Sequence, residues 1–143
     1  MRRILLICCV IFFSHQLSAQ EIGIRFGDMY GNNIGLDATI PISAKRIHAS
    51  VSFGDNVGLD VLYDFAVESI FRSPDLHYYA GVGLTTLFAS EFKLGVMGEL
   101  GIEYSFPKTP LSISLDYRPA VVVLEKMDFV YGIFGLNVRY VIR

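Results

Sequence analysis

Residues 46–65 consist of two runs in which apolar and polar residues alternate, joined by Gly54, Asp55 and Asn56. Only an extended strand places every second side chain on the same face. The apolar face of the first run consists of Ile47, Ala49, Val51 and Phe53. The apolar face of the second run consists of Val57, Leu59, Val61, Tyr63 and Phe65. Because Gly-Asp-Asn tolerates the left-handed backbone of a tight turn, these residues predict a β-hairpin with one apolar and one polar face.

The same alternation continues along the rest of the chain after residue 19. Six further runs show it: residues 21–26, 34–40, 77–84, 92–104, 111–118 and 134–140. The two prolines in Phe106–Pro110 exclude a central strand at that point, and Pro119 is expected to bulge or weaken the strand that starts at Leu111. The chain after residue 19 therefore predicts about eight antiparallel strands and no helix of useful length.

The first 19 residues have a different pattern, which is typical of a secretory signal peptide. Arg2 and Arg3 form a positive end, Ile4–Phe13 is an apolar core, and a small-residue cleavage site ends at Ala19. The apolar core is too short for a membrane-spanning helix, which needs about 20 residues. We therefore expect two segments, a signal peptide over residues 1–19 and a β-barrel over residues 20–143.

Cysteine content and charge restrict the class of protein further. Both cysteines, Cys8 and Cys9, lie in the predicted signal, so the exported chain has none and forms no disulfide. Export without disulfides favours a bacterial envelope protein. Without Arg2 and Arg3, ten basic residues stand against fourteen acidic ones, and no basic patch indicates nucleic-acid binding. Apolar residues are abundant but dispersed at a period of two, which is the signature of a transmembrane β-barrel.

Alternation alone does not show which face is buried, but the size of a barrel does. Eight strands enclose a space only wide enough for side chains, so an apolar face on nearly every strand favours exposure to lipid. The polar face carries charges of both signs, which can pair in a narrow lumen as buried charges require. We expect a structural charge network formed by Arg25, Asp37, Arg46, His48, Asp60, Asp64, His77, Lys93, Glu99, Glu103, Asp116, Arg118 and Arg139. A filled lumen of this kind argues against a passive pore.

Aromatic residues gather near the predicted strand ends, in two groups. Threading the hairpins up and down places near one rim Phe26, Phe53, Phe92 and Phe129. It places near the other rim Tyr63, Phe65, Tyr78, Tyr104 and Tyr140. Two aromatic girdles are expected at the two interfaces of a membrane.

These features together resemble the small outer-membrane β-barrel proteins of Gram-negative bacteria, the OmpA/OmpX-like eight-stranded class. The resemblance is carried by the signal, by the hairpins of residues 21–65, by Tyr79–Gly83 and by the strand Gly135–Val141. It implies an outer-membrane location, contact with outer-membrane lipid and lipopolysaccharide, and recognition of the last strand by the barrel-assembly machinery. That strand usually ends in an aromatic residue, whereas this chain continues past Tyr140 with Val141–Arg143. The class implies no single activity.

The polar face also carries residue types that occur in catalytic and metal-binding sites. A lipid A hydrolase would combine His48 or His77 with a serine and an acid, drawn from Ser50, Ser52, Asp60 and Asp64. Rim acids offer a possible divalent-cation site, although their spacing matches no calcium loop: Asp28, Asp55, Glu91, Glu125 and Asp128. We predict no catalytic, cofactor-binding or metal-binding residues and no enzyme activity.

The sequence thus predicts an all-β protein, an eight-stranded antiparallel up-and-down transmembrane β-barrel in the outer membrane, with a structural or envelope-interaction role. Two alternatives stay open at this point. One is an outer-membrane lipid A-modifying hydrolase, and the other is a soluble periplasmic β-barrel that binds an apolar ligand. Nothing in the sequence indicates a cofactor, and the oligomeric state is left open.

Overall fold

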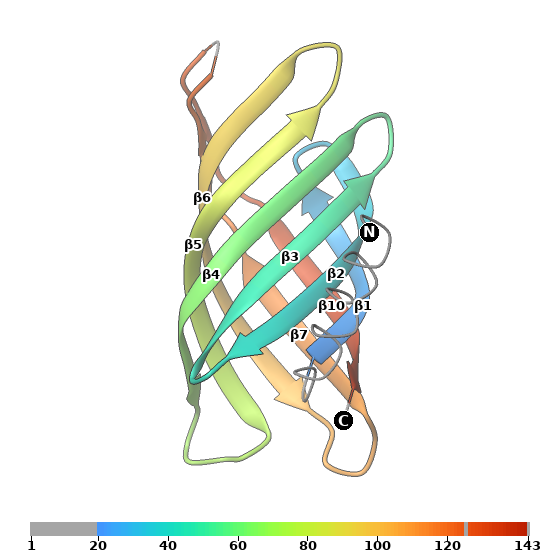
Figure 1. Cartoon of the computed structure of the whole chain (residues 1–143), viewed down its shortest axis with the longest axis vertical. Helices are drawn as coiled ribbons and strands as arrows, with labels where there is room; N and C mark the ends of the chain where they lie inside the picture. The colour runs from blue at the N-terminus through green and yellow to red at the C-terminus, as the bar shows by residue number, and fades with distance from the viewer. Residues whose placement is uncertain (1–19, 125, 143) are drawn as a thin grey trace, which may run out of the picture.

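The structure, a computed structural model, describes residues 20–124 and 126–142, and the predicted signal of residues 1–19 lies outside the described residues (Figure 1). The described residues form β1 (Gln20–Met29), β2 (Asn32–Ile42), β3 (Lys45–Phe53), β4 (Val57–Ser69), β5 (Leu76–Phe88), β6 (Phe92–Ser105), β7 (Leu111–Tyr117), β8 (Ala120–Val122), β9 (Asp128–Val130) and β10 (Phe134–Ile142). No helix in this part of the chain is long and apolar enough to cross a membrane.

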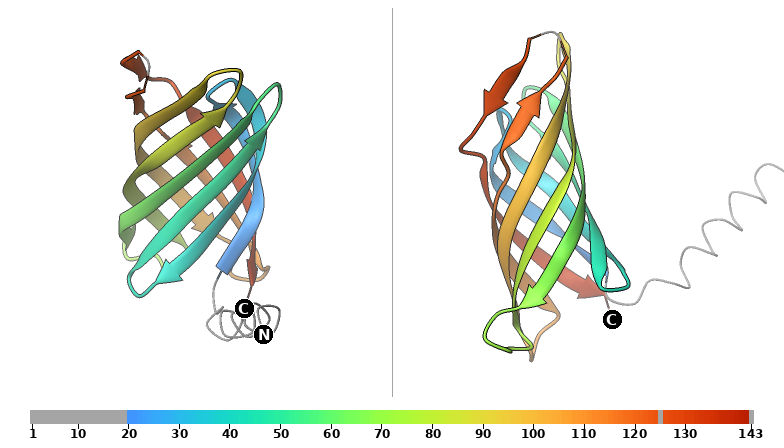
Figure 2. Two further views of the ribbon diagram at one scale, coloured as in Figure 1. Left: turned by 45° about the horizontal axis from the view of Figure 1, so that its top comes forward. Right: turned by 90° about the vertical axis from the view of Figure 1, so that its left-hand side faces the viewer.

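The strands close into one antiparallel barrel. Hydrogen-bonded neighbours run β5-β4-β3-β2-β1-β10-β7-β6, and pairing of β5 with β6 completes the circle. β7 with β8 forms one barrel strand and β9 with β10 forms another, so the circle has eight members (Figure 2). The predicted closed, eight-stranded, all-β architecture is confirmed.

The interruption between β7 and β8 lies at the proline that the sequence singled out. Pro119 has no backbone N–H to give to a ladder, and β7 stops two residues before it. The wall stays joined because Gly98 N–H donates to the Pro119 carbonyl at 2.9 Å and Arg118 N–H donates to the Ile133 carbonyl at 2.8 Å. Beyond this point β8 pairs with residues 95–97 of β6 and with β9.

β4 is longer than the sequence predicted. β4 extends to Ser69, beyond the alternating run that ends at Phe65. A bulge between Asp64 and Ala66 shifts the register there, so the strand continues while its alternation changes phase. β5 pairs with this extension and lengthens the wall on that side.

The connections divide between two rims. We call the upper rim the end that carries the β1–β2, β3–β4, β5–β6 and β8–β9 connections, and the lower rim the opposite end (Figures 1 and 2). The chain enters β1 and leaves β10 at the lower rim. The upper connections are short, so no long loop extends from the described part of that rim.

The two faces of the wall are inverted relative to a soluble protein. Large apolar side chains point outward and are exposed on every long strand, for example Leu36, Val82 and Leu115 at 53–63% exposure. Charged side chains point inward, and Arg25, His48 and Arg118 have no exposed surface. The only apolar cluster among the described buried residues is small, and it consists of Leu62, Met97, Ala120 and Ile133.

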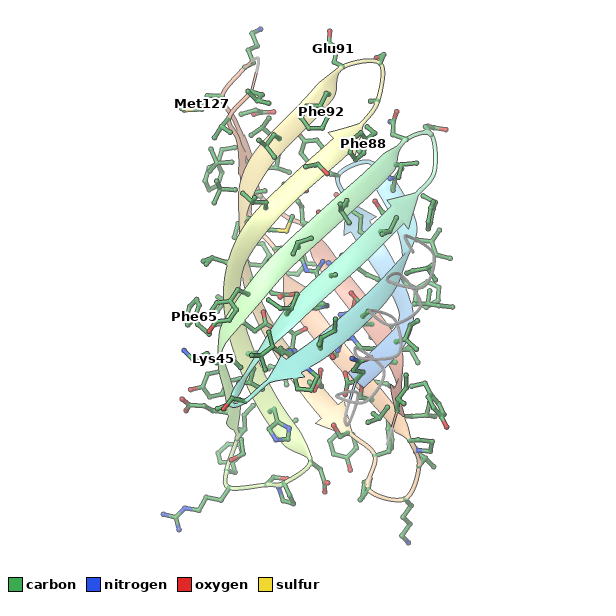
Figure 3. All side chains as sticks on the ribbon, viewed as in Figure 1. Lys45, Phe65, Phe88, Glu91, Phe92 and Met127 are labelled. Atoms are coloured by element: carbon green, nitrogen blue, oxygen red, sulfur yellow. The ribbon has the colours of Figure 1, made fainter. Side chains whose placement is uncertain are left out.

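Aromatic side chains outline both rims on the outer surface. Phe88 and Phe92 pack at the upper rim with ring centroids 5.4 Å apart, whereas Phe65 lies toward the lower rim (Figure 3). At the lower rim Tyr104 and Phe106 pack edge to face at 5.0 Å. The distribution follows the two girdles that the sequence predicted.

Candidate functional site

The lumen contains a network of ion pairs, in which most of the buried charged side chains of the described residues take part. It includes four arginines, Arg25, Arg46, Arg118 and Arg139. Their carboxylate partners are Glu21, Asp37, Asp60, Asp64, Glu99, Glu103 and Asp116. All of them except Arg118, which lies between β7 and β8, occupy inward positions of their strands, so the period-two alternation brings together side chains that are up to 118 residues apart in the chain.

Arg118 lies at the centre of the network. Its Nε donates to Glu99 Oε1 at 2.8 Å, and its Nη1 donates to Ser50 Oγ at 2.9 Å. The Asp60 and Asp116 carboxylates lie 3.4 and 3.5 Å from its terminal nitrogens. The residue precedes Pro119 in the break between β7 and β8, where its side chain extends into the lumen with no exposed surface.

Arg46 and Arg139 form a second group nearer the lower rim, where they share Glu103. Arg46 Nη1 lies 3.0 Å from Glu103 Oε2, and Arg139 Nη1 lies 2.7 Å from the same oxygen. Arg46 Nε also donates to Asp64 at 2.6 Å, and Arg139 Nε donates to Asp37. Each arginine bridges two carboxylates from different strands, so the group connects β2, β3, β4, β6 and β10 across the lumen.

Asp116 is the meeting point of a third group. Arg25 reaches it from β1, the Tyr79 hydroxyl donates to it from β5 at 3.3 Å, and Asn137 donates from β10 at 2.8 Å. Glycines make room for these side chains. A Cβ at Gly101 would meet the Tyr79 ring, and a Cβ at Gly135 would meet the Arg25 guanidinium.

This packing predicts a difference between two glycines of the same strand, β6. Gly101→Ala is expected to lower the free energy of unfolding by about 1–3 kcal/mol, the usual cost of overpacking. Tyr79 cannot easily move away, because it is buried and Arg46 lies over its ring at 4.3 Å. The control is Gly98→Ala, whose added Cβ would have Pro119 at 3.8 Å as its nearest neighbour. Urea titration of both variants checks this, and equal midpoints would contradict it.

His48 does not form the catalytic relay that the hydrolase hypothesis requires. Its Nδ1 lies 3.0 Å from Glu99 and its Nε2 lies 2.8 Å from Asp37. Ser50 Oγ donates to Asp60 at 3.4 Å and accepts from Arg118. A serine–histidine pair needs a free ring nitrogen facing the hydroxyl, and here both ring nitrogens face carboxylates. His48 is also fully buried.

One group in the described residues has the composition of a cation site. His48, Asp64 and Glu99 bring three candidate ligand atoms within 4.8 Å of one another. However, Arg46 pairs with Asp64 and Arg118 pairs with Glu99, so both carboxylates already have cationic partners. The four described rim acids, Asp28, Asp55, Glu91 and Asp128, form no comparable group, and Glu125 lies outside the described residues.

The structure brings together eleven of the thirteen residues that the sequence assigned to the lumen network. The other two stand apart, because His77 lines a small pocket at the lower rim and Lys93 lies near the upper rim. The network also includes polar residues that were not assigned to it, namely Glu21, Ser50, Tyr79, Ser114 and Asn137. Their inward positions in the alternation were the available signal. For the four uncharged residues that position does not by itself indicate membership of an ion-pair network, whereas Glu21 carried the same signal as the assigned acids and was missed.

Comparisons of the chain with protein-family models, with curated proteins and with solved structures each found no match. The closed barrel is consistent with the class of small barrels that the sequence resembles, and no family match adds to that resemblance.

Proposed function

We propose that this chain is an outer-membrane β-barrel protein whose lumen is closed by the ion-pair network and whose role is structural or in envelope interaction. The observation that carries the proposal is the inversion of the wall, with apolar side chains exposed all around the barrel and charges buried inside. In water such a surface would favour association and aggregation, because soluble monomers rarely expose apolar patches larger than a few hundred Å².

In a bilayer the apolar outer surface would contact lipid rather than water, which removes the cost of exposing it. A bilayer would also account for the closed circle of hydrogen-bonded strands. Backbone N–H and C=O groups in lipid have no water to bond, so a β-protein crosses a membrane only as a closed barrel. The circle of paired strands meets this requirement over the height of the apolar belt. The aromatic residues at both rims fit the two interfaces, where amphipathic rings are favoured.

The network supports a closed lumen rather than a channel. Arg25, Arg118 and His48 fill the middle of the barrel without exposed surface. Buried charges of this kind are retained only when partners satisfy them, and each arginine here has at least one carboxylate partner. We therefore propose no conduction, and we assign the network to holding the barrel wall in a fixed shape.

The last strand fits recognition by the barrel-assembly machinery. β10 presents Leu136, Val138 and Tyr140 outward, and it pairs with both β1 and β7. β10 therefore closes the circle of strands, and this closure would follow once the assembly machinery has bound the last strand. This role is carried over from the resemblance and is part of the proposal.

Electrophoresis of fractionated cells tests the proposal. We expect the protein in the outer-membrane fraction, and we expect an unboiled sample to migrate faster on an SDS gel than a boiled one, since a ladder without open edges resists SDS at room temperature. A soluble periplasmic protein with a single band would contradict the proposal. It would favour the alternative of a soluble barrel with an apolar ligand.

A further inference from the structure

Above the ion-pair network, the lumen opens into a vestibule at the upper rim, with a volume of about 550 Å³. We define the vestibule by its lining residues Tyr30, Glu91, Lys93, Val122, Leu124, Lys126, Met127 and Asp128. Glu91 and Met127 lie at the upper rim (Figure 3). The volume falls within the range of sites that hold a small organic molecule, about 300–1,000 Å³.

Lys93 is a basic residue of the vestibule that forms no ion pair within the described part of the chain. It points inward from β6 and is partly buried, with its Nζ 5.8 Å from the centre of the Tyr30 ring. None of the ion pairs within residues 20–124 and 126–142 includes it, whereas every arginine of the lumen has a carboxylate partner. A partly desolvated ammonium beside apolar residues favours the binding of an anion.

The floor of the vestibule is apolar and closed. Val122 and Leu87 are buried there, and the void beneath Lys93 measures only about 10 Å³. Thr85, which donates to Asp60 of the ion-pair network, also lines that void, so the network begins directly below it. A ligand would therefore stay in the vestibule, where Val122, Leu124 and Met127 offer it an aliphatic wall.

The wall beside the vestibule is incomplete. The ladder between β1 and β10 stops at Gly27 and Gly135, and β9 has a described partner only in β8. On the outer surface at this position Phe129 and Tyr131 are exposed. The vestibule residue Asp128 belongs to this strand, β9, so the vestibule lies next to this exposed apolar surface.

We propose that the vestibule binds a single-chain amphiphile with a carboxylate headgroup. Lys93 and Lys126 hold the headgroup, and the chain lies against Val122, Leu124 and Met127. Glu91 and Asp128 lie on the same lining and offset part of the positive charge, so a headgroup with one negative charge fits better than a multiply charged phosphate. The site depends on the barrel fold and goes beyond the structural role proposed above.

Calorimetric titration of sodium decanoate tests the proposal, with the protein in phosphatidylcholine nanodiscs and empty nanodiscs as the blank. We expect saturable binding to the protein beyond the blank. Lys93→Met keeps the apolar stem and is expected to weaken decanoate binding about tenfold, the worth of one charge-assisted hydrogen bond. Binding of neutral 1-decanol to the same variant is expected to change less than about twofold, because the apolar wall is unaltered.

The matched control is Lys45→Met. Lys45 Nζ lies 5.7 Å from the centre of the Tyr63 ring near the lower rim, so it shares the local geometry of Lys93 but lies far from the vestibule. This variant is expected to bind decanoate as the unaltered protein does. Leu124→Ser, at a half-exposed position, is expected to weaken decanoate and decanol binding together, by several-fold.

Three results would overturn the proposal: a titration equal to that of empty nanodiscs, equal decanoate binding by the Lys93 and Lys45 variants, or no effect of Leu124→Ser on either compound. The unboiled SDS-gel band shows whether each variant is folded. If Lys93→Met does not fold, Lys93→Gln and Leu124→Ser still decide the outcome. A protein that proves soluble is titrated in the same way in buffer.

Discussion

Replacement of Arg118 by methionine is expected to lower the free energy of unfolding by about 3–5 kcal/mol, the cost of removing one partner from a buried ion pair. Arg118 contacts Glu99 at 2.8 Å and Asp60 at 3.4 Å, with no exposed surface of its own. Methionine fills part of the volume but offers neither charge nor donors. The Glu99 carboxylate would then lie in the lumen beside His48 without its arginine, and Ser50 Oγ would lose a donor.

Urea titration of the folded barrel, followed by the unboiled gel band, measures this effect. The matched control is Arg72→Met in the exposed connection between β4 and β5, which is expected to change the free energy of unfolding by no more than about 0.5 kcal/mol. Similar values for the two variants would show that the lumen network does not hold the barrel together, and the closed-lumen account would have to be abandoned.

The closed barrel could be predicted because it follows from the order of apolar and polar residues within each strand. Alternation at a period of two fixes which side chains share a face, and it placed Arg25, Asp116 and Arg139 together although the sequence shows no contact between them. The size of an eight-stranded barrel then decided which face is inside. Pro119 marked the break between β7 and β8 for the same reason, since a proline cannot donate to a ladder.

Features that depend on register and on specific packing could not be predicted. Leu62 and Met97 interrupt the polar face of β4 and β6, and only the structure shows that they meet Ile133 to form an apolar cluster. Tyr79 joins the network because its hydroxyl reaches Asp116 past Gly101, a relation set by the pairing of three strands. Lys93 was assigned to the network from its inward position, but its height on β6 places it in the vestibule.

The difference between the two ends of the lumen follows from the same residues. In the middle and lower parts of the lumen the inward positions carry arginines and acids that pair with one another. Toward the upper rim Lys93 lines a small void with the buried residues Leu87 and Val122, so it lies beside apolar neighbours. The lower part is therefore suited to stability, and the upper part is suited to binding.

The proposed contact of the apolar belt with lipid is tested most directly by Val82→Arg. Val82 is the middle residue of β5 and its side chain is 53% exposed on the outer surface. In a bilayer, an arginine at mid-height on the lipid face costs about 2–4 kcal/mol, whereas one near an interface costs about 0–1 kcal/mol. The comparison variant is Leu111→Arg, at the first residue of β7 near the lower rim and 41% exposed.

The measurement is the free energy of unfolding of both variants in lipid vesicles, by urea titration. We predict that Val82→Arg destabilises the protein by about 2–4 kcal/mol and Leu111→Arg by no more than about 1 kcal/mol. Changes within about 0.5 kcal/mol for both variants, as exposed positions in water show, would contradict the membrane orientation. The apolar belt would then have to be covered by a protein partner or a ligand.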